Sequence, residues 1–152
     1  IIKREHGSIP VFIAGESMGG LIGFLTVIKK PRLFRGLICI SPGFKSSLKF
    51  SLMEYFKMVI ARFYNAKKQF YMPFTNEMCT RDPECLKIMN ADKLEHKWAT
   101  PKLLQSILLG QWASKLLKHK VRTDTLFLLA GADKSCQTAI GIFLQFCPLL
   151  LR

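Results

Sequence analysis

Short apolar runs along the chain alternate between strand-like and helix-like patterns. Residues 11–14 predict a strand with apolar side chains on both faces, as in a parallel sheet buried between helices. The apolar, glycine-dotted segment after it predicts a helix from about Met18 to residues 29–30, where Pro31 prevents continuation. A second apolar run, residues 36–40, predicts another buried strand. Because strand, helix and strand follow one another closely, they indicate a right-handed crossover and a parallel sheet.

The pattern becomes helical between residue 44 and about residue 120. Residues 47–64 predict an amphipathic helix, with apolar side chains at positions 48, 52, 55, 56, 59, 60 and 63. This apolar face either packs against the rest of the domain or forms a pliable wall for an acyl chain. Residues 71–84 contain two prolines and no sustained period, and they predict a loop. A second amphipathic helix is predicted to begin at Pro101.

A third apolar run, residues 125–130, predicts a strand that leads directly into Gly131, Ala132 and Asp133. The carboxyl ends of parallel strands meet at one edge of the sheet, where open α/β sheets assemble their sites. Asp133 is therefore placed to orient a catalytic base. The alternative interpretation of Asp133 is a turn or capping residue. The remaining residues, 135–152, show no recognisable chemistry.

The sequence Gly15-Glu16-Ser17-Met18-Gly19 lies between the first strand and the first helix. A serine hydroxyl becomes a useful nucleophile only on a rigid, exposed support beside a base and oxyanion donors. A sharp strand-to-helix turn provides that support, and Gly15, Gly19 and Gly20 keep bulk away from the serine. The bare motif is also typical of structural turns, but the flanking strand and helix favour the catalytic interpretation. Ser17 is therefore the candidate nucleophile.

Charge and composition narrow the choice of partners. The 152 residues carry a net charge of +13 and are 49% hydrophobic, which is typical of one folded domain. Residues 44–121 hold 12 lysines and two arginines against six acids, a net charge of +8. This excess favours anionic partners such as a membrane surface, although solvated helical faces are often equally charged. No nucleic-acid motif accompanies the charge, so we do not expect nucleic acid as a partner.

The five cysteines show neither Cys-x-x-Cys spacing nor neighbouring histidines at zinc-ligand spacing. We therefore expect no metal and no other cofactor. An odd number of cysteines is typical of a reduced, cytoplasmic protein, whereas a bridge between Cys79 and Cys85 would require an oxidising compartment. The first residues do not resemble a signal peptide, and the glycines and proline among residues 10–28 fit a turn better than a membrane span. We expect a cytoplasmic protein, with peripheral contact at a membrane as an alternative.

Three stretches of the chain together resemble the α/β-hydrolase superfamily, in its branch of monoacylglycerol lipases, lysophospholipases and serine aminopeptidase-like proteins. These stretches, which match in order and spacing, are residues 10–20, 36–43 and 126–134. The intervening segment corresponds loosely to the helical cap of that family. The resemblance implies an α/β fold in which residues 1–43 and 122–152 form the hydrolase core and residues 44–121 form an inserted helical cap.

The resemblance also implies a chemistry, the hydrolysis of an ester of a lipid or small lipid-like molecule through an acyl-enzyme. Carried over by position, Ser17 is the nucleophile, the amide of Met18 is one oxyanion donor and Asp133 is the triad acid. Members of the family commonly have histidine before the nucleophile. This chain has Glu16 there, a variant that we expect to be tolerated.

Two parts of that machinery have no counterpart in the sequence. In this family the triad histidine follows the acid, whereas His6, His96 and His119 all precede Asp133. The second oxyanion donor comes from an earlier loop, and only about three strands are recognisable. We therefore expect an incomplete α/β-hydrolase fold, inactive by itself, that belongs to the interior of a hydrolase or to a truncated gene. The alternative is a non-catalytic basic module that binds a membrane surface or an anionic partner on the same scaffold.

Overall fold

The computed structural model describes residues 2–7, 9–45, 50–65 and 67–129. Its contacts divide the chain into two compact units. Unit 1 consists of Ile1–Lys45 and Leu108–Arg152, and unit 2 of Ser46–Ile107. Each unit has its own sheet and its own apolar core.

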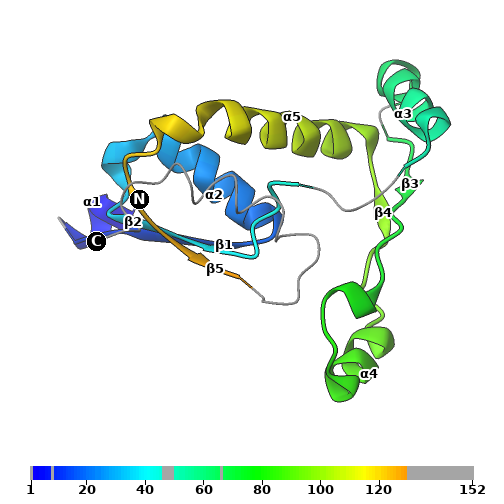
Figure 1. Cartoon of the computed structure of the whole chain (residues 1–152), viewed down its shortest axis with the longest axis horizontal. Helices are drawn as coiled ribbons and strands as arrows, with labels where there is room; N and C mark the ends of the chain where they lie inside the picture. The colour runs from blue at the N-terminus through cyan, green and yellow to red at the C-terminus, as the bar shows by residue number, and fades with distance from the viewer. Residues whose placement is uncertain (1, 8, 46–49, 66, 130–152) are drawn as a thin grey trace. The chain divides into compact units, whose positions relative to one another are not determined.

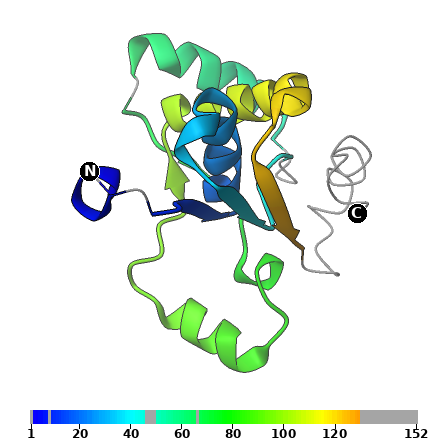
Figure 2. The same cartoon turned by 90° about the vertical axis from the view of Figure 1, so that its left-hand side faces the viewer.

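Unit 1 is built on a parallel sheet with the strand order β1-β2-β5 (Figures 1 and 2). The strands are β1 (Phe12–Glu16), β2 (Gly36–Ile40) and β5 (Asp124–Leu128). In the register of the sheet, Ile40 of the central strand pairs with Glu16 on one side and with Leu128 on the other. All three strands therefore end level with one another, and the turns that follow them share one edge. The predicted parallel sheet is confirmed.

One face of this sheet is covered by α2 (Met18–Lys29). The helix ends where predicted, and a 3-10 turn, Pro31–Leu33, carries the chain towards β2. The N-terminal helix α1 spans Ile2–His6. The buried core lies between α2 and the sheet, and consists of Leu21, Phe24, Val27, Leu37, Cys39 and Phe44.

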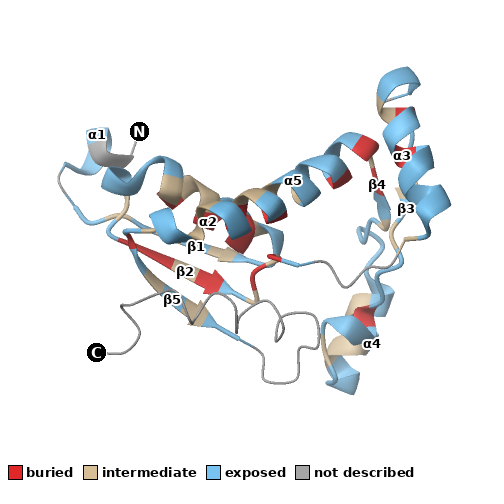
Figure 3. Ribbon diagram, turned by 45° about the horizontal axis from the view of Figure 1, so that its top comes forward, coloured by how far each residue is buried: buried red, intermediate tan, exposed pale blue. Residues whose placement is uncertain are grey.

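The opposite face of the sheet carries exposed side chains in the described structure, whereas most residues of the central strand β2 are buried (Figure 3). Alternate residues of the three strands point to this face because side chains of a strand alternate between faces. Phe12, Ile40, Leu126 and Leu128 are exposed there, whereas Ile13, Leu37 and Phe127 pack on the α2 side. The prediction that β1 is apolar and buried on both faces is therefore wrong for the described residues.

Unit 2 begins with α3 (Leu52–Tyr64), which lies within the predicted helix over residues 47–64. Ser51 accepts a hydrogen bond from the amide of Glu54, whose side chain accepts one from the amide of Ser51, so the helix begins with a reciprocal capping box. Of the positions predicted for its apolar face, 52, 55, 56, 59, 60 and 63 are exposed, and in this helix only Met58 and Ala61 are buried.

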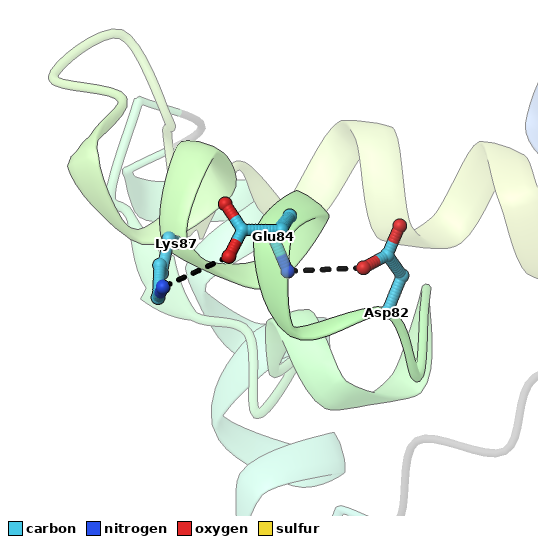
Figure 4. A network of polar contacts seen from close by, with 3 residues as sticks. All are labelled: Asp82, Glu84 and Lys87. Atoms are coloured by element: carbon cyan, nitrogen blue, oxygen red, sulfur yellow. Dashed lines mark hydrogen bonds and ion pairs between the residues drawn. The ribbon is translucent and has the colours of Figure 1, made fainter.

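The loop predicted over residues 71–84 contains a 3-10 turn, Asn76–Met78, and its first and last residues belong to regular elements. The short strands β3 (Phe70–Tyr71) and β4 (Trp98–Ala99), which pair antiparallel, and the helix α4 (Pro83–Ala91) were not predicted. Asp82 caps α4 by accepting from the amide of Glu84, and Glu84 pairs with Lys87 at 2.9 Å (Figure 4). Met58, Ala99 and Leu104 form the small buried core of this unit, with Phe50, Phe70 and Met72 packed against it.

The helix α5 (Pro101–Leu117) begins at the predicted residue and contributes to both units. Its buried row contains polar side chains, because Gln111 and Ser114 are buried while the apolar Trp112 and Leu116 are exposed. The apolar periodicity predicted for this helix therefore does not account for these two buried polar residues, although Leu104 on the same helix is buried. A 3-10 turn, Lys118–Lys120, then leads to β5. Within the part of the chain that the structure describes, no helix is long and apolar enough to cross a membrane.

Candidate active site

Ser17 lies at the junction of β1 and α2, between Glu16, the last residue of the strand, and Met18, the first of the helix. Its backbone has φ 50° and ψ −116°, a region that residues with a side chain rarely adopt. Ser17 and Met18 are both exposed. The turn therefore holds a serine in a strained conformation at the carboxyl edge of the sheet, where its side chain is accessible.

Two glycines allow the backbone to fold this tightly. A Cβ atom on Gly15 would overlap the carbonyl group of Gly19, and a Cβ atom on Gly20 would lie 2.8 Å from Cβ of Pro42. The Gly-x-Ser-x-Gly motif predicted the same need at Gly19. That prediction is wrong, because a Cβ atom on Gly19 would meet no described atom within 4 Å apart from its chain neighbours and the backbone of its own helix.

The turn after β2 fixes the serine turn through the main chain. The amide of Ser17 donates to the carbonyl oxygen of Ile40 at 3.0 Å, and the amide of Gly43 donates to the carbonyl oxygen of Ser17 at 2.7 Å. Ser41 also has a positive φ of 39°, and its amide donates to the carbonyl oxygen of Leu128 at 2.8 Å. The ends of all three strands are thus joined by hydrogen bonds beneath the serine.

A buried aromatic residue anchors this second turn. Phe44 is fully buried, and its ring meets those of Phe24 and Phe127 edge to face, at centroid distances of 4.9 and 6.2 Å. Cys39 is buried in the same core, and its Sγ donates to the carbonyl oxygen of Gly20 at 3.7 Å. Burial raises the pKa of the Cys39 thiol to about 12, so the thiol stays protonated and unreactive.

The structure describes two of the three predicted site residues, Ser17 and Met18, but not Asp133. Ser17 and Met18 lie together at the turn, with the amide of Met18 in the first turn of α2. Asp133 lies outside the described residues, which end at 129, although β5 leads to the edge of the sheet that carries Ser17. A catalytic acid at this edge stays a prediction.

The three histidines, His6, His96 and His119, are exposed. His96 lines a cavity of about 420 Å³ in unit 2, together with Met72, Phe74, Asn76, Met89, Asp92, Glu95 and Lys97. Among the described residues no group of three or more His, Cys, Asp or Glu side chains could hold a metal ion. Cys79 and Cys85 are not joined to each other.

A family model described as serine aminopeptidase, S33, matches residues 1–144 of the chain. The chain belongs to this family. Human monoglyceride lipase is 27% identical to this family member over 141 residues, which make up 90% of this chain and 46% of the human protein. Rat monoglyceride lipase is 42% identical over 41 residues, 27% of this chain and 14% of the rat protein. The chain thus spans less than half the length of these curated relatives.

Solved structures agree on the fold of this serine aminopeptidase family member. The monoacylglycerol lipase of Paleococcus ferrophilus superposes with a TM-score of 0.83 at 19% identity, over 97% of this chain and 57% of that one. A thioesterase domain from the curacin biosynthetic pathway superposes with a TM-score of 0.51 at 12% identity, over 95% of this chain and 60% of that one. The prediction of an α/β-hydrolase fold is confirmed.

Sequence reasoning missed the residues that support the serine turn. The sequence patterns predicted no supporting role for Gly43, Phe44 or Gln111. Gln111 is buried on α5, and its Nε2 donates to the carbonyl oxygen of Gly43 at 2.9 Å. One available signal was the helical spacing of Leu104, Ile107 and Gln111, which places the glutamine on the row that packs inward.

Proposed function

We propose that this protein is a serine hydrolase of lipid or small carboxylic esters, with Ser17 as its nucleophile. The single observation that carries the proposal is the strained, exposed Ser17 between β1 and α2. Such strain persists only where the surrounding structure holds it, and it is concentrated at functional sites. The family, and the names of the lipases that the chain resembles, support a lipid ester as the substrate.

The proposed reaction follows from the placement of Ser17. Its Oγ attacks the ester carbonyl carbon while a base takes the hydroxyl proton, and the carbonyl oxygen becomes an oxyanion. The amide of Met18, at the start of α2, donates to that oxygen, and the helix dipole favours the negative charge. The base returns its proton to the leaving alcohol, and water then releases the acid from Ser17. Asp133 would orient the base.

We further propose that these 152 residues have little activity by themselves. None of the three histidines follows Asp133, and the described ones are exposed on α1, in unit 2 and after α5. Without a base, the serine hydroxyl keeps its proton and attacks slowly. Added imidazole, a small base of the same chemistry as histidine, should then increase the reactivity of Ser17.

A fluorophosphonate probe tests both parts of this proposal. Attack by Ser17 Oγ forms a P–O bond and breaks the P–F bond, while the hydroxyl proton passes to the base. We expect slow modification of Ser17, accelerated at least tenfold by imidazole, and none in Ser17→Ala, as measured by peptide mass spectrometry. Equal modification of wild type and Ser17→Ala would contradict the role of Ser17. Fast modification without imidazole would show that a base is present, and His96→Ala and His119→Ala would locate it.

We also propose peripheral contact with an anionic membrane, because α3 carries an exposed apolar stripe. Phe56 and Phe63 are 62% and 86% exposed, and Leu52 and Val59 lie on the same side at helical spacing. The buried residues of this helix, Met58 and Ala61, lie on its other side. An apolar stripe within a segment of net charge +8 is typical of helices that lie in the lipid interface.

Co-sedimentation with phosphatidylserine-containing vesicles tests this contact. We expect binding that falls as salt increases and that weakens in Phe56→Ser and Phe63→Ser, since both side chains are exposed and their loss leaves the core intact. Ser17→Ala should bind like wild type. Equal binding to neutral vesicles, or no effect of either phenylalanine substitution, would contradict the proposal.

A further inference from the structure

Gln111 makes an unusual contact for a glutamine in the middle of a helix. It is 7% exposed, and its Nε2 donates to the carbonyl oxygen of Gly43 at 2.9 Å. A buried amide left without its partner is energetically costly, so this geometry is strongly preferred over a broken one. Gln111 therefore fixes α5 to the turn that follows β2.

Gly43 passes this constraint on to Ser17. While its carbonyl group accepts from Gln111, its amide donates to the carbonyl oxygen of Ser17 at 2.7 Å. The approach is close, because a Cβ atom on Gly43 would lie 3.3 Å from the carbonyl carbon and oxygen of Ser17 and 3.4 Å from the amide nitrogen of Met18. Two hydrogen bonds in series thus connect α5 to the peptide group between Ser17 and Met18.

Gln111 is itself held firmly in place. The hydroxyl of Ser114, which is fully buried, donates to the carbonyl oxygen of Gln111 at 2.8 Å. One residue earlier, a Cβ atom on Gly110 would lie 3.3 Å from Cδ2 of Leu21, so α5 packs closely against α2 at this point. The backbone of Gln111 is therefore rigid, and a residue can orient its neighbours only if it is itself held rigidly.

We propose that Gln111 is a positioning residue for the nucleophile. Through Gly43 it fixes the peptide group between Ser17 and Met18, whose orientation sets ψ of Ser17 and the direction of the Met18 amide. Removing the Gln111 side-chain amide should let this peptide group rotate, which turns the Met18 amide, the proposed oxyanion donor, away from the oxyanion. The inference rests on the proposed function of Ser17 as nucleophile, but its structural part can be measured independently.

Two substitutions separate the hydrogen bond from the volume of the side chain. Gln111→Leu removes the donor, and Gln111→Glu keeps the shape but, when ionised, offers only acceptors to the carbonyl oxygen of Gly43. A protonated carboxyl group can donate again, so acidification should restore the contact in Gln111→Glu and not in Gln111→Leu. Gln105→Leu is the matched control, because Gln105 lies on the same helix, is exposed and accepts from Arg62 instead.

The first measurement is amide hydrogen exchange of Gly43 by NMR, expressed as a protection factor. We expect protection to fall at least tenfold in Gln111→Leu and in Gln111→Glu at neutral pH, to recover in Gln111→Glu at acidic pH, and to stay unchanged in Gln105→Leu. Unchanged protection in Gln111→Leu, or no recovery of Gln111→Glu with acid, would overturn the proposed coupling.

The second measurement is the rate of fluorophosphonate modification of Ser17 with imidazole present, at a temperature where every variant is fully folded. We expect at least a tenfold loss in Gln111→Leu and none in Gln105→Leu. Val27→Ala, which destabilises the core of unit 1 away from the turn, should keep the wild-type rate, since the substitution affects only packing. If protection falls but the rate does not, the positioning role is wrong. If wild type is never modified while protection falls, the proposed function of Ser17 fails and the coupling stands.

Discussion

The amide of Ser17 donates to the carbonyl oxygen of Ile40 at 3.0 Å. This bond continues the ladder between β1 and β2 one residue beyond the end of β1 at Glu16. The chain therefore leaves the sheet only after the serine amide has been fixed. The change of direction from strand to helix is made by φ and ψ of Ser17 itself. The sheet and the turn after β2 together provide the rigidity that the strained conformation needs.

Alanine should destabilise the fold at two glycines of the turn, Gly15 and Gly20, but not at the third, Gly19. In Gly15→Ala and Gly20→Ala the new methyl group would press on the carbonyl group of Gly19 and on Pro42, so we expect losses of about 1–3 kcal/mol in the free energy of unfolding. Gly19→Ala meets open space and should be neutral or stabilising by up to about 1 kcal/mol, since alanine is the better helix former. Urea denaturation monitored by circular dichroism measures all three. Equal losses at the three positions would contradict the packing.

Phe44→Ala should strongly destabilise unit 1. The ring is fully buried between Phe24 and Phe127, and removing a buried phenylalanine typically costs about 3–5 kcal/mol. Phe63→Ala, at an exposed ring of unit 2, is the matched control and should change the free energy of unfolding by less than about 0.5 kcal/mol. The prediction fails if the two substitutions have similar effects in thermal denaturation.

The Cys39 thiol should resist alkylation in the folded protein. With a pKa of about 12, only on the order of one thiol in ten thousand is ionised at pH 8, and the group is also buried. Peptide mapping after iodoacetamide treatment should show Cys85 modified and Cys39 unmodified until urea is added. Rapid modification of Cys39 under native conditions would contradict its burial.

The same raised pKa predicts that alkali weakens the fold. An unfolded thiol ionises near its ordinary pKa of about 8.5, whereas the folded Cys39 thiol stays neutral until about pH 12. The unfolded state therefore loses protons first, and the stabilisation present below the ordinary thiol pKa is lost as pH rises towards 12. Cys39→Ala should show a smaller decline in the free energy of unfolding between pH 8 and pH 10 than wild type does; equal declines would count against this account.

The capping box of α3 should make Glu54 an unusually strong acid. Hydrogen bonds from the backbone and then the side chain of Ser51 lower the pKa of the Glu54 carboxyl group. The cap is therefore intact at neutral pH, and its contribution is lost as pH falls through this lowered pKa. Carbon-13 NMR titration should give a midpoint below the usual glutamate range, and Ser51→Ala should move it back upward. A midpoint in the usual range in wild type would show that the box is not formed.

Local sequence predicted the elements that carry the candidate nucleophile. The apolar run 11–14, the Gly-x-Ser-x-Gly motif and Pro31 after the helix predicted β1, the turn and α2 with bounds close to those observed. These features are local, because strand patterning, glycine content and helix termination depend on near neighbours. Short strands such as Trp98–Ala99 were missed, since two residues carry no periodicity.

The amino-acid sequence by itself determined which residue is the candidate nucleophile, where its strand and helix lie and that the sheet is parallel, because these follow from periodicity and from a motif of fixed spacing. Only the tertiary structure decided what holds Ser17 in place. The contacts of Gly43 and Gln111 join residues far apart along the chain, and nothing in a local pattern reveals a buried glutamine that donates to a distant carbonyl group. Tertiary packing likewise decided that, among the described residues, one face of the sheet is exposed and α5 buries Gln111 and Ser114 while its Trp112 and Leu116 are exposed.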